Sequence, residues 1–115
     1  MRLEAESDAD RDFVASFIDT DRMGRRLGEV ALVDASSRIG QTGRIYYNTL
    51  LDENAAAHFA FGSGFGGTRS ETPDRAVNSS TIHLDVMIGG PDLEATGFNG
   101  RGRRVPLIRE GAWQI

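Results

Sequence analysis

Hydrophobic residues at helical spacing indicate where helices form in this chain. Phe13, Val14, Phe17 and Ile18 recur behind a serine and several acidic residues, which predicts a surface helix over residues 7–18. A further helical turn is expected over residues 21–27. Residues 55–61 are small or apolar all round and follow an acidic Asp-Glu-Asn start, so this segment is expected to be a buried helix.

Short runs of β-branched and apolar residues predict strands elsewhere. They lie at residues 28–33, 44–48, 81–88, 93–98, 104–108 and 112–115. Asn99-Gly100 is a favoured two-residue turn, so the two strands that flank it are expected to form a hairpin. The pattern therefore predicts an α+β fold, a single domain over residues 1–115, with a mainly antiparallel sheet, one buried helix and an N-terminal surface helix.

His83 and Asp85 stand one residue apart in the apolar run over residues 81–88. Alternate residues of a strand share a face, so the imidazole and the carboxylate are expected side by side, with Leu84 and Val86 on the other face. An imidazole beside a carboxylate suits a divalent metal such as zinc. A histidine that simply hydrogen-bonds an aspartate in a core strand is the alternative.

Two further polar residues occur where the pattern predicts an interior. Glu29 lies in the apolar strand over residues 28–33, and His58 lies inside the expected buried helix. A buried carboxylate without a partner costs several kcal/mol, and a buried histidine needs a hydrogen-bond acceptor. Glu29 at a wet sheet edge and His58 bonded to a backbone carbonyl are the alternatives to a functional role.

Composition limits the classes of function. The net charge of −4 argues against a nucleic-acid surface, and the Arg101, Arg103 and Arg104 cluster is expected to be a solvated hairpin. The chain has no cysteine, so any metal must be held by His, Asp, Glu and water. No apolar run approaches about 20 residues, and we therefore expect a soluble, cytoplasmic protein that does not bind membranes.

Three ordered segments resemble the C-terminal part of the M29 metallo-aminopeptidases, the aminopeptidase T and aminopeptidase S group. They are residues 27–33 (LGEVALV), residues 47–58 (YNTLLDENAAAH) and residues 82–89 (IHLDVMIG). The ending over residues 97–113 is also similar to the closing hairpins of that family. The resemblance covers nearly the whole chain, and the N-terminal α/β domain of the family lies outside these 115 residues.

The resemblance implies an exopeptidase that removes N-terminal residues from peptides with two divalent metals, which we expect to be zinc, cobalt or manganese. It implies Glu29, His58, His83 and Asp85 as metal ligands, with Glu29 bridging the two ions. Paired metals share a hydroxide and polarise the scissile carbonyl. Family subunits pair into dimers, so a homo-oligomer is also implied.

Two differences from the family keep other interpretations open. The family has a further glutamate ligand upstream of the region matched here, and a tyrosine seven residues after the histidine that corresponds to His58, where this chain has Phe65. His58, His83 and Asp85 also have the composition of a facial triad for non-haem iron, as in a dioxygenase related to the dihydroxypyridine dioxygenases. An inactive structural or assembly domain is the third interpretation.

Overall fold

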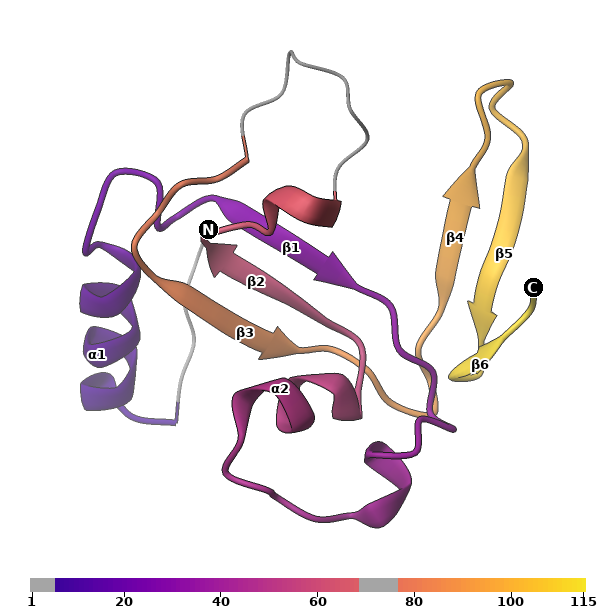
Figure 1. Ribbon diagram of the computed structural model, residues 1–115, viewed down its shortest axis with the longest axis horizontal. Helices are drawn as coiled ribbons and strands as arrows, with labels where there is room; N and C mark the ends of the chain where they lie inside the picture. Colours follow the sequence, from indigo (N-terminus) through magenta and orange to yellow (C-terminus); the bar gives the residue numbers. More distant parts are fainter. Residues whose placement is uncertain (1–5, 69–76) are drawn as a thin grey trace. The chain divides into compact units, whose positions relative to one another are not determined.

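A computed structural model describes residues 6–68 and 77–115 of the chain (Figure 1). The chain divides into two compact units, residues 1–30 with 59–86 and residues 31–58 with 87–115. Each unit is described by itself. Part of the glycine-rich connection after residue 62 lies outside the described residues.

The first element is helix α1, Asp8–Ile18, as the hydrophobic spacing predicts. Ser7 caps it by accepting a hydrogen bond from the backbone N–H of Asp10 at 3.1 Å, which satisfies one of the unpaired amides of the first turn. Ile18 is fully buried and anchors the helix. Among the described residues, no helix is long and apolar enough to cross a membrane.

Three strands make the sheet that carries the candidate site. They are β1 (Leu27–Ala31), β2 (His58–Gly62) and β3 (His83–Met87), in the order β1-β2-β3, and neighbouring arrows run in opposite directions in Figure 1. The expected strands at residues 28–33 and 81–88 are therefore confirmed in kind, each a little shorter than predicted. The expected antiparallel pairing is confirmed as well.

Close backbone approach explains two glycines at the edge of β2. A Cβ atom on Gly28 would collide with the carbonyl oxygens of Gly62 and Ser63, so β1 comes nearer to the end of β2 than a side chain permits. Gly62 itself has a φ of 91°, a conformation that side chains rarely adopt. Glycine at both positions lets the backbone at the end of β2 lie close to the neighbouring backbone.

The buried helix expected over residues 55–61 is wrong, because His58 begins strand β2. Burial alternates along this strand, with His58, Ala60 and Gly62 more buried than the two phenylalanines between them. A short apolar segment that is covered on both sides has no periodicity that separates a helix from a central strand. The alanines predict a helix, but pairing with β1 and β3 on both edges of β2 outweighs that local preference.

Two other expectations for this part of the chain are also wrong. Residues 21–27 form hydrogen-bonded turns and the start of β1 instead of a helical turn, and residues 44–48 form no strand. The Asp52 carboxylate accepts from the backbone N–H groups of Tyr46 and Asn48 at 2.8 and 3.1 Å. Those two amides are therefore bonded to a side chain, and Tyr47 between them has a φ of 54°, which a strand does not allow.

Four short helices lie in the connections between strands over the described residues. They are η1 (Gly40–Thr42), α2 (Thr49–Asp52), η2 (Glu53–Ala55) and η3 (Gly66–Thr68). The acidic segment predicted to start the buried helix thus does start a helix, but one that ends before His58.

A second antiparallel sheet is formed by β4 (Ala95–Phe98), β5 (Arg104–Arg109) and β6 (Ala112–Trp113). The Asn99 side chain accepts from the backbone N–H groups of Arg101 and Arg103, both at 3.0 Å, and so closes the expected hairpin. The arginines of this turn are exposed, as expected, and Ile108 is fully buried. The strands are thus divided between two sheets, where the sequence pattern predicts one.

Candidate metal centre

The four residues singled out in the sequence lie on three neighbouring strands. Glu29 is on β1, His58 is the first residue of β2, and both His83 and Asp85 are on β3. The expected proximity of His83 and Asp85 is confirmed.

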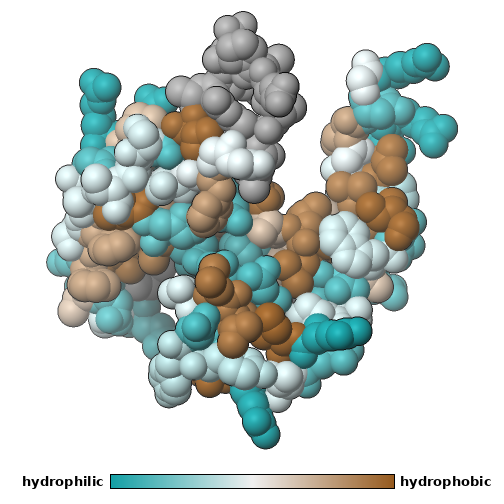
Figure 2. Space-filling model, in the orientation of Figure 1, coloured by the Kyte–Doolittle hydropathy of each residue, from teal (hydrophilic) through white to brown (hydrophobic). Residues whose placement is uncertain are grey.

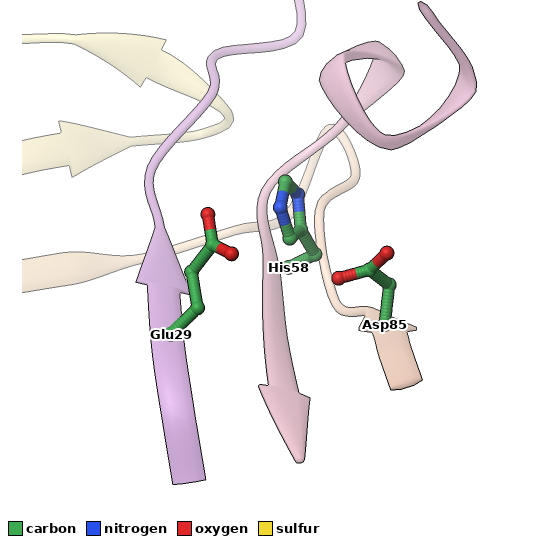
Figure 3. A group of neighbouring side chains, drawn as sticks. All are labelled: Glu29, His58 and Asp85. Carbon is green, nitrogen blue, oxygen red and sulfur yellow. The ribbon is translucent and has the colours of Figure 1, made fainter. Parts of the chain in front are cut away.

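Glu29, His58 and Asp85 form one group of possible ligands. One ligand atom from each lies within 4.8 Å of the others (Figure 3), and the three side chains reach toward a common point from three different strands. His58 is 2% exposed, whereas the two carboxylates are half-buried. A buried imidazole between two carboxylates is a donor set for a divalent cation.

His83 joins the same two carboxylates. Its Nε2 atom lies 3.1 Å from Oδ1 of Asp85 and 3.4 Å from Oε2 of Glu29. The three side chains have similar exposed fractions, 25% for His83, 24% for Glu29 and 23% for Asp85, so water reaches this part of the cluster. The two carboxylates therefore face both histidines of the chain.

Each histidine is oriented by a backbone carbonyl. Nδ1 of His83 lies 2.8 Å from the Ser63 carbonyl oxygen, and Nδ1 of His58 lies 3.0 Å from that of Ala56. The carbonyl acceptors assign a proton to Nδ1 in both rings, which makes Nε2 the ligand nitrogen. A histidine that binds a metal through one ring nitrogen usually donates the N–H of the other ring nitrogen to an acceptor such as a backbone carbonyl.

The contacts of His83 fit a bound ion. Ligand atoms that lie about 2.0–2.2 Å from one ion are roughly 2.9–3.5 Å from each other in tetrahedral or octahedral geometry. The contacts from Nε2 to the two carboxylates, 3.1 and 3.4 Å, fall in that range. The 3.1 Å contact between Nε2 of His83 and Oδ1 of Asp85 is also what the hydrogen-bonded pair considered as the alternative requires.

Sequence reasoning did not identify the groups that orient the histidines. The carbonyl oxygens of Ser63 and Ala56 belong to the main chain, so no residue type marks them. Phe65 was singled out, and its ring lies 5.4 Å from the His83 ring between centroids, tilted by 58°. It is thus a direct neighbour of the candidate site.

Comparison with known proteins places the chain in a metalloprotease family. The family model described as thermophilic metalloprotease (M29) matches residues 3–113. Aminopeptidase T of Thermus aquaticus is 40% identical over the whole chain, and aminopeptidase 2 of Geobacillus stearothermophilus is 44% identical over 84% of it. The solved structure of wild-type AmpT from Thermus thermophilus superposes with a TM-score of 0.82 at 38% identity, covering 98% of this chain.

Because the metalloprotease family model matches residues 3–113, the chain belongs to the M29 family. The chain spans 30% of aminopeptidase T from Thermus aquaticus, 25% of the Geobacillus protein and 29% of the AmpT structure. The family resemblance inferred from the three sequence segments is therefore confirmed.

Proposed function

We propose that this chain provides the C-terminal metal-binding region of a metallo-aminopeptidase that removes N-terminal residues from peptides. The observation that carries the proposal is the convergence of both histidines and two carboxylates on three adjacent strands, with each Nδ1 tied to a backbone carbonyl. The family match supports this interpretation over the dioxygenase and the inactive domain.

The proposed ligand set is Glu29, His58, His83 and Asp85, and it holds two divalent ions. Glu29 and Asp85 face both histidines, so each carboxylate is suited to serve two positions. Carboxylates bridge metal pairs well because each has two oxygen atoms. Zinc, cobalt and manganese are the expected ions.

In this reaction the residues of the chain bind the ions and orient the side chains that hold them. When bound, paired divalent ions supply an activated hydroxide and polarise the scissile carbonyl. The Ser63 and Ala56 carbonyls hold the two imidazole rings in place, so little reorganisation is needed on binding. A carboxylate beside the ions is a candidate proton carrier for the leaving amine.

Elemental analysis of the dialysed chain tests the proposal. After exposure to zinc, cobalt, manganese or anaerobic iron(II), we expect about two equivalents of a divalent ion, with hydrolysis of short peptides from the amino end. One equivalent of iron with oxygen consumption supports the dioxygenase instead. Retention of no metal contradicts the proposed site.

Phe65→Tyr is expected to raise peptide hydrolysis. The ring contacts His83, and a phenol at this position donates a hydrogen bond that a phenyl ring cannot. A donor to the developing oxyanion is worth about 10²–10³ in kcat elsewhere, so a gain of up to about 100-fold is expected. Phe65→Leu is the matched control and should not gain activity. An equal kcat for Phe65→Tyr and the wild-type chain excludes the position from the reaction.

Self-association is the expected behaviour of the purified chain. Ile45, Tyr47 and Leu50 are 74%, 94% and 70% exposed, and hydrophobic residues lie on the surface shown in Figure 2. Exposed apolar residues of this size favour contact with a second copy. Sedimentation velocity checks this expectation, and a strictly monomeric species at high concentration contradicts it.

A further inference from the structure

A hydrogen-bonded group lies at the starts of β1 and β3, outside the candidate metal centre. It consists of Asp21, Asn78, Ser80 and Thr81, and we call it the strand-end cluster. Thr81 precedes His83 by two residues, a distance of about 7 Å along an extended chain. Leu27, whose carbonyl the cluster binds, precedes Glu29 by the same number of residues.

Asp21 links the segment that precedes β1 to the segment that precedes β3. Its Oδ2 atom accepts from the Ser80 hydroxyl and the Thr81 backbone N–H, both at 2.8 Å, and from the Thr81 hydroxyl at 3.0 Å. Its Oδ1 atom accepts from the backbone N–H groups of Met23 and Gly24 at 2.8 and 3.0 Å. These bonds, led by the Thr81 N–H and the Ser80 hydroxyl, hold the pKa of Asp21 well below its usual range, so the carboxylate is charged at neutral pH.

Asn78 links β1 directly to the lead-in of β3. Its side-chain NH₂ lies 3.1 Å from the carbonyl oxygens of Met23 and Arg26 and 3.4 Å from that of Leu27. Its side-chain oxygen accepts from the Ser80 N–H at 3.0 Å. β1 and β3 are not neighbours in the sheet, so this side chain connects the start of β1 to the segment that precedes β3, although β2 lies between the two strands.

The same region also determines how the end of β2 is placed. The Gly64 N–H donates to the Asn78 carbonyl at 2.9 Å, and the Ser63 N–H donates to the Ile82 carbonyl at 2.7 Å. Ser63 is the residue whose carbonyl orients His83. The hydrogen bonds of the strand-end cluster therefore extend, through the main chain, to the group that holds the His83 ring.

We infer that Asp21 and Asn78 are positioning residues for the metal centre, which set the spacing of β1 and β3 and hold His83 in the orientation its ligand role requires. The hydrogen bonds given above for their side chains go to the segments that precede and begin β1 and to the segment that precedes β3. Their effect passes through Leu27 to Glu29 on one side, and through Thr81 and Ser63 to His83 on the other. The inference rests on the proposed function, and of its two tests only the metal-binding measurement requires that function to be correct.

Two readouts on the purified 115-residue chain separate this role from general stability. The chain has only two histidines, so ¹⁵N spectra of the rings report His83 and His58 individually without any metal. Cobalt(II) titration reports affinity and, through its absorption spectrum, ligand geometry. Asn78→Ala and Asp21→Asn are expected to shift the His83 ring signals in the metal-free chain and to weaken cobalt affinity by about 10–100-fold, the usual effect of disturbing groups that orient ligands.

Asn99→Ala is the matched control, because the Asn99 side chain likewise accepts hydrogen bonds from backbone N–H groups but lies in the β4–β5 turn. It should leave both readouts unchanged. Thr81→Val, which removes one hydrogen bond of Asp21, decides the matter if the other variants fail to fold, and Thr81→Ser should restore the wild-type signals. If the variants shift the His83 signals but neither they nor the wild-type chain bind cobalt, the result contradicts the metal proposal. The positioning role for the His83 ring then still stands. Unchanged His83 signals in folded variants overturn the positioning role.

Discussion

Replacement of His83 or Asp85 by alanine is expected to abolish most metal retention by this chain. Both side chains contribute to the same contact, with Nε2 of His83 lying 3.1 Å from Oδ1 of Asp85. Changing a group that only orients a ligand costs about 10–100-fold in metal affinity, so loss of a ligand itself should cost at least the upper end of that range. Metal content after dialysis, measured by elemental analysis, checks the expectation.

The control for these variants is Arg103→Ala. Arg103 is charged and exposed in the turn between β4 and β5, so its loss changes the net charge of the chain without touching the candidate ligands. Its metal content should equal that of the wild type. Equal metal content in all three variants would remove His83 and Asp85 from the proposed site.

Glu29→Gln is expected to separate a one-metal from a two-metal centre. Glu29 lies 3.4 Å from His83 and also belongs to the group with His58 and Asp85, so its charge acts on both histidines. The amide keeps the size of the side chain but provides one neutral oxygen in place of two charged ones, which suits a divalent ion poorly. We expect one of two equivalents to be lost and the other to bind about 100-fold more weakly.

Glu110→Gln provides the matched control, since Glu110 is an exposed glutamate of the β5–β6 turn. It should retain both equivalents. Loss of both equivalents in Glu29→Gln indicates that both ions depend on Glu29. Full retention of two equivalents would show that Glu29 holds neither.

Local rules of sequence succeeded where neighbouring residues decide the structure. Ser7 and the spacing of the apolar residues behind it were enough for α1, and Asn99 was enough for the β4–β5 hairpin. The alternation over residues 81–88 likewise predicted that His83 and Asp85 stand together. In each case the controlling contacts lie within a few residues along the chain.

Local rules failed where distant residues compete for the same segment. Residues 55–61 were expected to be helical, yet His58 lies in a strand because β1 and β3 pair with both its edges. Residues 44–48 were expected to pair as a strand, yet the Asp52 carboxylate takes two of their backbone amides. Neither competition can be read from hydrophobic periodicity, which records burial but not the partner.

The sequence by itself determined the residue types of the candidate site and the family. It limited the possible ligands to two histidines and to carboxylates, it marked Glu29, His58, His83 and Asp85 as polar residues in apolar surroundings, and it identified the M29 family. Those conclusions depend on residue types and their order, which the chain carries directly.

Only the tertiary structure decided how these residues meet. It placed His58 on the central strand, where both carboxylates reach it, and it revealed the Ser63 and Ala56 carbonyls that orient the rings. It also showed that Asp21 and Asn78 join the segments that precede β1 and β3. Backbone carbonyls have no residue code, and hydrogen bonds between segments more than 50 residues apart arise only when the sheet assembles, so sequence patterns could not have shown them.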